Sequence, residues 1–439
     1  MLTREENELL TRVGPETPMG HLMRRYWVPA LLSAELPPGG RVKRVRLLGE
    51  DLVAVRARDG KVGLLAEFCS HRGASLYFGR NEEAGLRCVY HGWKFGWDGR
   101  CVDMPNEPPA SNFQEKVRHP AYPCAERGGV VWTYMGPADP PALPDLEWTS
   151  LPDDRRFVSK FYQECNYLQG LEGGVDPAHI SFLHGVVDAG DEALRDLDRA
   201  SAGFALVAQL EKAPEIEVVD TAYGALIAAR RDAGNGQYYW RITQFHMPFH
   251  TMPPTDPKPD PLMHSHIFVP VDDEHFVNWC ISWHPARALT REELTAMRAG
   301  ASIHITSYAP ATDEPYGDIR PLAHRHNEYL VDWEAHQTRK FFGVPGVGTQ
   351  DKAITESQRP IVDRSRERLG RADTGIIRIR KCLADATVDL RDHGTPPPGL
   401  DPASFRIRPA SILLPKDAPW VERAREQLVA VGHRVSPPA

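Results

Sequence analysis

Apolar and polar positions alternate through the first third of the chain, from about Arg41 to Gly136. Within the run from Val42 to Phe68 the alternation is interrupted by Asp59-Gly60, a pair typical of a tight hairpin turn. The later segments GLRCVYHGWKFGWDGRCV and GGVVWTYMG are short, rich in valine and aromatic residues, and punctuated by glycine. This pattern predicts a small all-β domain.

A proline-rich stretch from Pro137 to Pro144 ends the β pattern, because proline lacks the backbone donor that a strand or helix interior needs. We interpret this stretch as a linker. The chain is then expected to have three parts: residues 1–40 as a helical segment that packs on the second domain, residues 41–140 as the β domain, and residues 141–439 as the second domain.

The second domain opens with a helical pattern at Tyr162–Leu171, which we expect to break at Gly173-Gly174 and to resume at Pro177. Further patterns predict antiparallel strands at 200–211, 216–231, 237–247, 264–271 and 275–285, and helices at 291–300, 327–341 and 350–369. Strands followed by helices indicate an α+β fold. The tail after Asp392 is expected to be ordered only where it docks.

Composition and charge exclude some classes of binding partner. The 439 residues carry a net charge of −7 without a long run of like charges, so no nucleic-acid-binding patch is expected. No apolar stretch reaches the ~18 residues of a membrane span, and the N-terminus is charged, so we expect no signal peptide and no membrane contact. The 7 cysteines are scattered and odd in number, which favours reduced thiols and a cytoplasmic location.

Two short loops combine cysteine and histidine in the β domain. Cys69-Ser-His71 is followed by Cys88-Val-Tyr-His91, so two loops can bring four metal ligands face to face. Either a tetrahedral zinc ion or a [2Fe–2S] cluster fits this inventory. The ligand order favours the cluster, because each loop then supplies one thiolate to the inner iron and one imidazole to the outer iron.

A second group of candidate ligands lies beside the expected helix break. Asp176 and His179 are three residues apart and share a helix face, whereas His184 can join His179 only where the helix ends or widens. Two histidines and one carboxylate are the ligand set of non-haem Fe(II) oxygenases. The alternatives are ordinary core or surface histidines, and for Asp176 a helix N-cap ahead of Pro177.

The loops with C-x-H-R-G-A and C-x-Y-H-G-W-x-F resemble the Rieske domain of ring-hydroxylating non-haem iron oxygenases. Ser70 stands where proline is common in that family. The resemblance implies a [2Fe–2S] cluster held by the four loop ligands and one mononuclear Fe(II) in a second domain of helix-grip (START-like) architecture. Imidazole ligands raise the cluster's reduction potential, so it can accept electrons from a reduced flavin or a ferredoxin.

The same resemblance assigns roles in the second group. The segment from Asp176 to His184 resembles the family's D-x₂-H-x₄-H iron motif, in which both histidines ligate iron. In that family, the aspartate of this motif hydrogen-bonds a ligand histidine and bridges to the Rieske histidine of a neighbouring subunit. The resemblance therefore makes Asp176 a candidate catalytic residue. For the third ligand, Q-D-x-A-x-x-E-S points to Asp351, with Asp332 and Asp363 as weaker candidates.

The resemblance extends along nearly the whole chain and is strongest to the phthalate 4,5-dioxygenase group. It implies an oxygenase component, active as a trimer or hexamer of one kind of subunit, that takes electrons from an NAD(P)H-dependent reductase and uses O₂ to cis-dihydroxylate an aromatic carboxylate. Monooxygenation, O-demethylation or ether cleavage of a substituted benzoate is the alternative. A non-enzymatic Rieske electron carrier or ligand-binding protein is the alternative from another class, and it would not need the two-histidine, one-carboxylate set.

An aromatic carboxylate calls for an arginine in the pocket, because a guanidinium binds a carboxylate with two parallel hydrogen bonds. Strand alternation places Arg241 on the same sheet face as Tyr239, Thr243 and Phe245. Arg241 is therefore the candidate for substrate binding, and Arg230 and Arg231 are weaker ones. An exposed or ion-paired arginine is the alternative for each.

Overall fold

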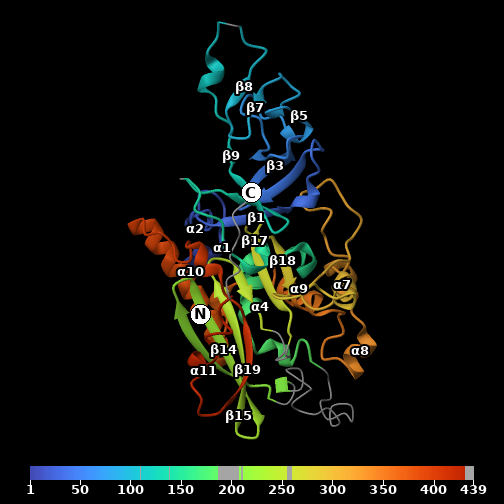
Figure 1. Ribbon diagram of the computed structural model, residues 1–439, viewed down its shortest axis with the longest axis vertical. Coiled ribbons are helices and arrows are strands. Elements are labelled where there is room, and N and C mark those ends of the chain that lie inside the picture. The colour runs from blue at the N-terminus through green and yellow to red at the C-terminus, as the bar shows by residue number, and fades with distance from the viewer. Residues whose placement is uncertain (109, 138, 186–206, 209–210, 255–259, 431–439) are drawn as a thin grey trace.

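The computed structural model describes all residues except 109, 138, 186–206, 209–210, 255–259 and 431–439. Figure 1 shows the N-terminal β-strands grouped at one end of the molecule and a larger sheet with its helices forming the rest. The described part of the chain contains no helix that combines the length and the apolar character needed to cross a bilayer.

Three small antiparallel sheets form the N-terminal part, as the alternating pattern predicts. One has the order β1-β11-β10, one β2-β3-β4-β9, and one β5-β6-β7-β8. Their strands are β1 (Trp27–Leu32), β2 (Lys43–Leu47), β3 (Glu50–Arg56), β4 (Val62–Ala66), β5 (Arg80–Glu82), β6 (Gly85–Arg87), β7 (Lys94–Phe95), β8 (Cys101–Asp103), β9 (Ala121–Tyr122), β10 (Cys124–Arg127) and β11 (Val130–Tyr134).

An eight-stranded antiparallel sheet forms the second part, in the order β12-β18-β17-β16-β15-β14-β13, with β19 paired to β15. Its strands are β12 (Arg156–Gln163), β13 (Glu215–Thr221), β14 (Gly224–Gly234), β15 (Gln237–His246), β16 (His250–Met252), β17 (Met263–Pro270), β18 (Phe276–Trp283) and β19 (Ala410–Pro415). A β domain followed by an antiparallel sheet with helices is the α+β architecture that the sequence predicts.

Helices occur at both ends of the chain and beside the large sheet. They are α1 (Arg4–Thr11), α2 (Pro18–Met23), α3 (Glu147–Ser150), α4 (Tyr167–Val175), α7 (Arg291–Arg298), α8 (Trp333–Thr338), α9 (Val347–Ser357), α10 (Thr374–His393) and α11 (Trp420–Ala424). Helix α4 contacts β15, β16 and β17 on one side and α9 on another.

Several predicted helix boundaries are wrong. Helix α4 starts at Tyr167, where Asn166 caps it, and it runs through Gly173-Gly174 to Val175 before Pro177 ends it. The helix expected at 350–369 stops at Ser357 ahead of Pro360, and that expected at 327–341 is divided into a 3₁₀ segment and α8.

Two other predictions differ in kind. The 20-residue helix α10, the longest of those described, was not predicted, and β19 in the tail adds a strand to the large sheet. The strand expected at 200–211 falls mostly on residues outside the described part of the chain.

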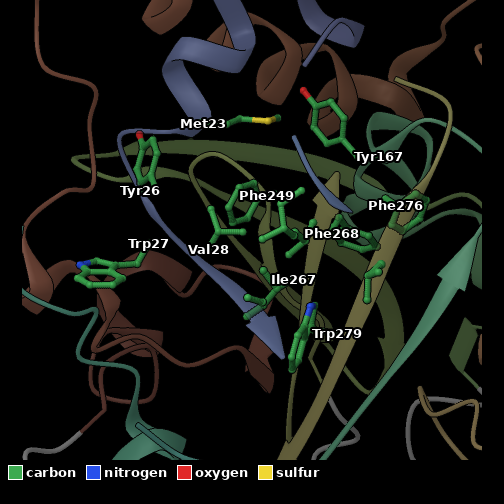
Figure 2. Close-up of a cluster of buried hydrophobic side chains, with 14 of the residues drawn as sticks. Met23, Tyr26, Trp27, Val28, Tyr167, Phe249, Ile267, Phe268, Phe276 and Trp279 are labelled. Carbon is green, nitrogen blue, oxygen red and sulfur yellow. The ribbon is translucent and has the colours of Figure 1, made fainter. Parts of the chain in front are cut away.

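The N-terminal segment and the eight-stranded sheet share one apolar core. Figure 2 shows Met23, Tyr26 and Val28 of this segment among Phe249, in the turn before β16, and Ile267 of β17. Helix α4 joins the same core through Tyr167, whose hydroxyl donates to the carbonyl of Leu10 at 2.8 Å. The first strand and the first helices therefore fix the position of α4.

Helix α4 lies unusually close to the sheet. A Cβ atom at Gly174 would lie 2.9 Å from both the Phe268 ring and the Thr251 hydroxyl. This distance is too short for any residue with a side chain. Glycine at this position therefore lets the last turn of α4 approach β16 and β17.

A buried ionic cluster holds the other side of α4. Both carboxylate oxygens of Glu172 accept from Arg364 at 2.9 Å, and one also accepts from Arg380 at 2.6 Å. Burial alone would raise the pKa of Glu172, but the two guanidinium groups outweigh it and hold the pKa below its ordinary value. Arg380 in turn binds Glu367 through two hydrogen bonds.

We predict that Glu172→Gln lowers the free energy of unfolding by about 3 kcal/mol or more, because it leaves Arg364 buried without its counter-charge. The matched control is Glu215→Gln at the exposed pair with Arg230, where a loss below about 1 kcal/mol is expected. Urea unfolding of both variants measures the difference. Equal losses would show that the cluster does not stabilise α4.

Candidate functional site

The two Cys/His loops have the same backbone geometry. The N–H of Cys69 donates to the carbonyl of Ala74, and the N–H of Gly73 donates back to Cys69; the second loop repeats this with Cys88, Trp93 and Gly92. Both glycines have positive φ, +71° at Gly73 and +78° at Gly92, which explains why each loop has glycine four residues after its cysteine. The local sequence therefore builds two matched turns.

These turns bring the four candidate ligands together. The sulfur-bearing residues Cys69 and Cys88 are buried, and the imidazole rings of His71 and His91 lie half-buried with centroids 4.5 Å apart. The Trp93 ring stacks on His71 at 4.4 Å and is itself buried, so it packs in the β core beside this ligand.

A metal cluster fits this arrangement. The Nδ1 atom of His71 is buried and has no hydrogen-bond partner among the described residues, which a metal bond would satisfy. Burial and the neighbouring Cys88 raise the pKa of the Cys69 thiol to about 11. A bound metal stabilises the thiolate form, so two adjacent buried thiols ionise when a metal binds them.

Ser70 makes a specific contact in the first loop. The Nε2 atom of His119 faces the carbonyl of Ala66 at 2.8 Å and must carry the proton there, so its Nδ1 atom accepts from the Ser70 hydroxyl at 2.8 Å. Ser70 thus ties the ligand loop to the β core, a contact that proline could not make.

The second group also assembles. Among the described residues, His179, His184 and Asp351 form one group whose ligand atoms all lie within 4.8 Å of one another. The Nε2 atom of His184 lies 3.2 Å from Asp351 Oδ1, and that of His179 lies 3.6 Å from the same oxygen. Three ligand atoms at these distances fit a single metal ion.

Hydrogen bonds fix which nitrogen of each histidine faces the metal position. The Gln350 amide nitrogen donates to the carbonyls of Phe342 and Val344, so its oxygen accepts from His184 Nδ1 at 2.7 Å. Asp176 similarly lies 3.3 Å from His179 Nδ1. Both histidines therefore direct the Nε2 lone pair towards Asp351.

Charge interactions strengthen the Asp176–His179 contact. Burial opposes the charged form of Asp176, but its hydrogen bond with His179 outweighs this and lowers the pKa of the carboxyl group. Asp176 also accepts from the Ala178 N–H at 2.7 Å, which fixes the backbone just ahead of His179.

The weaker candidates for the third ligand lie elsewhere. Asp332 caps α8 by accepting from the Ala335 N–H, and Asp363 accepts from Ser365. Each carboxylate thus has a local structural role, whereas Asp351 faces the two histidines.

A cavity of about 640 Å³ adjoins this group and is lined by His179, His184 and Asp351 among others. Arg241 and Thr243 line it from β15, as strand alternation predicts. Arg230 instead binds Glu215 and lies 4.7 Å over the Tyr238 ring.

Arg231 has a structural contact. Its guanidinium group donates to the Pro177 carbonyl at 2.7 Å, and it therefore holds the backbone next to Asp176. Burial, with the positive charge of Arg241 nearby, lowers the pKa of Arg231 to about 10.

Sequence reasoning missed two histidines of the cavity wall, His264 and His266 on β17. Their spacing of two residues on a strand is the signal that could have identified them, because it places both rings on one sheet face. It also missed the contact of Gln350 with His184, which only the fold brings together.

Comparison with known proteins identifies two families in the chain. Residues 26–119 match the Rieske [2Fe-2S] domain, and residues 133–429 match the family described as LigXa C-terminal domain like. The chain is 39% identical over 438 residues to the 3-chlorobenzoate-3,4-dioxygenase oxygenase subunit of Comamonas testosteroni, covering 98% of this chain and 99% of that relative. It is also 39% identical over 395 residues to the phthalate 4,5-dioxygenase oxygenase subunit of Pseudomonas putida, covering 88% and 86% of the two chains.

Solved structures show the same fold. The terminal oxygenase of carbazole 1,9a-dioxygenase from Nocardioides aromaticivorans IC177 superposes with a TM-score of 0.55 at 19% identity, covering 84% of this chain and 97% of that one.

We predict that Gln350→Leu weakens binding of the mononuclear metal about 10- to 100-fold, because His184 loses the acceptor that fixes its proton on Nδ1. The matched control is Gln358→Leu at the exposed end of α9, which should bind iron like the wild type. Titration of metal-depleted protein with Fe(II) under anaerobic conditions measures both. Equal affinities in the two variants would contradict the role of Gln350.

Proposed function

The chain belongs to the Rieske aromatic ring-hydroxylating oxygenases, as an oxygenase subunit, and from this premise we propose that its substrate is an aromatic carboxylate. The observation that carries the substrate class is Arg241, which lines the same cavity as His179, His184 and Asp351. A guanidinium group in that position can bind a carboxylate with two hydrogen bonds while the ring extends towards the metal position. We propose cis-dihydroxylation as the reaction.

The family carries one Rieske [2Fe–2S] cluster and one mononuclear iron, and we assign their ligands in this chain. Cys69, His71, Cys88 and His91 would hold the cluster, and the group of His179, His184 and Asp351 would hold the iron. When bound, the cluster supplies single electrons and the iron activates O₂ beside the substrate. A ligand-binding protein or a simple electron carrier would not need the second ligand set beside a cavity.

The residues around the iron position keep its ligands oriented. Asp176 and Gln350 each hold a proton on the Nδ1 atom of a ligand histidine, which leaves both Nε2 atoms free to bind metal. Arg231 holds the Pro177 carbonyl and thereby the backbone that carries Asp176. These contacts preorganise the site before a metal or a substrate binds.

We propose that the active form is a homo-oligomer, a trimer or hexamer, in which electrons cross between subunits. Within one chain the cluster loops join strands of the small N-terminal sheets, with β5, β7 and β8 at one end of the molecule, whereas α4 packs on the large sheet (Figure 1). The cluster loops also expose apolar side chains, with Val89 56% and Tyr90 55% exposed, which a neighbouring subunit would cover. Electrons would enter from a reductase that oxidises NAD(P)H.

Arg241→Met is predicted to raise KM for an aromatic carboxylate about 10-fold or more, because a charge-assisted hydrogen-bonded pair is lost. Phthalate and 3-chlorobenzoate are the probes, assayed for product with a reductase and NADH. Arg230→Met is the matched control, since Arg230 is paired with Glu215 outside the cavity. An unchanged KM in Arg241→Met, or turnover of neither acid by the wild type, would overturn the proposed substrate class.

We propose that Asp176 bridges the cluster of a neighbouring subunit to the iron position, and Asp176→Asn tests this electron path. The variant keeps the size of the side chain but removes the charge beside His179, so reduction of the cluster should persist while its reoxidation in a single turnover slows at least about 10-fold. Stopped-flow absorption of the reduced, substrate-bound protein after mixing with O₂ measures this rate. Reoxidation at the wild-type rate, or full activity of a monomeric preparation, would contradict the proposed bridge.

A further inference from the structure

A chain of hydrogen bonds leads from the cavity into the sheet. His264 lines the cavity on β17, and its Nδ1 atom lies 2.7 Å from the Ser282 hydroxyl on β18. The same hydroxyl lies 2.8 Å from His304 Nε2, and His304 Nδ1 lies 2.7 Å from the Ser159 hydroxyl on β12. We call these four side chains the imidazole–hydroxyl chain.

The imidazole–hydroxyl chain is buried and electrically neutral. Ser282 is fully buried, and His304 and Ser159 are 1% and 5% exposed. Burial lowers the pKa of His264 to about 4 and lowers the pKa of His304 well below its ordinary value. At neutral pH each ring therefore carries one proton, and each has one donor and one acceptor nitrogen.

The buried end sets the direction of the chain. The Ser159 hydroxyl has His304 Nδ1 as its hydrogen-bond partner, and no other partner is found for it among the described residues. A buried hydroxyl proton without an acceptor is costly, so Ser159 donates to His304 Nδ1. The reverse direction would strand that proton.

Each further step follows from the first. His304 must carry its proton on Nε2 and donate it to Ser282, so Ser282 donates its own proton to His264 Nδ1. His264 then carries its proton on Nε2. That nitrogen lies 3.4 Å from the Ser302 hydroxyl, which is too long for a strong hydrogen bond, so its N–H is available to a ligand in the cavity.

The cavity wall also carries a positive group that can bind an anion. Asp260 and Glu293 line the cavity, but both are paired with Arg287, at 2.6 Å and 2.8 Å. Arg287 offsets one of these two negative charges, and Arg241 contributes positive charge from β15.

We propose that the imidazole–hydroxyl chain fixes His264 as a hydrogen-bond donor to a carboxylate oxygen of the substrate, which makes His264 a specificity-determining residue. Ser282, His304 and Ser159 are positioning residues that act through it. This inference rests on the proposed function, since it assumes an aromatic acid in the cavity, and it adds the group that selects such acids over neutral aromatic compounds of the same shape.

The test compares one acid with one neutral analogue. Ser282→Ala removes the hydroxyl that holds the proton on His264 Nε2, so 3-chlorobenzoate should bind about 10-fold more weakly. Binding of 3-chlorotoluene should change less than about 2-fold, since it has no oxygen to accept from His264. Calorimetry with anaerobic holoenzyme gives both Kd values, and steady-state assays should show the effect in KM more than in kcat.

Three further variants complete the design. Ser265→Ala is the matched control, because Ser265 is a buried serine on β17 that donates to the Thr251 carbonyl instead. His264→Phe should reproduce the loss for 3-chlorobenzoate, and His264→Gln, which keeps a donor, should restore part of the affinity.

The outcomes separate the two proposals. If Ser282→Ala binds 3-chlorobenzoate as tightly as Ser265→Ala does, or loses both ligands equally, the imidazole–hydroxyl chain has only a structural role and the inference is wrong. If the wild type binds neither 3-chlorobenzoate nor phthalate, the proposed substrate class is wrong and the inference fails with it.

Discussion

The proposed iron site depends on the ion pairs between the buried Glu172 carboxylate and two arginines. A carboxylate removed from water must be paired. Arg364 and Arg380, which pair with it, lie 192 and 208 residues further along the chain. These ion pairs hold the last turn of α4 on one side. On the other side, Gly174 lets the sheet approach closely. Asp176 and His179 follow within a few residues, so their positions are set by where α4 ends.

The proposed third ligand, Asp351, lies on a separate anchored element. Helix α9 carries Gln350 and Asp351, and Glu356 near its C-terminal end accepts from the Glu164 N–H and the Tyr329 hydroxyl, each at 2.8 Å. The carboxylate of Asp351 and the amide oxygen of Gln350 thereby meet His184 from a fixed direction. The segment that follows α4 carries both histidines and α9 carries the carboxylate, so the fold brings the three side chains together. The cavity beside them receives polar groups from the sheet.

Local chemistry explains what could be predicted from the sequence. The loops around Cys69 and Cys88 are short turns whose spacing is fixed by their own backbone, so the β domain and the approach of the four candidate ligands could be predicted together. Helix boundaries, β19 and the position of α10 depend on contacts across the fold and could not. Arg230 and Arg231 are adjacent in sequence yet differ completely, one paired at the surface and one holding Pro177, because alternation puts them on opposite sheet faces. The imidazole–hydroxyl chain joins three strands and a loop, so no local pattern contains it.

We propose that the segment after α4 and helix α9 together form one mononuclear iron site from His179, His184 and Asp351 beside the cavity. The most direct measurement is anomalous diffraction at the iron absorption edge from crystals of the aerobically purified protein. We expect one anomalous peak bounded by Nε2 of His179, Nε2 of His184 and the Asp351 carboxylate, separate from the peak of the cluster between the two loops. A single peak at the loops, with none between α4 and α9 in iron-loaded crystals, would contradict it.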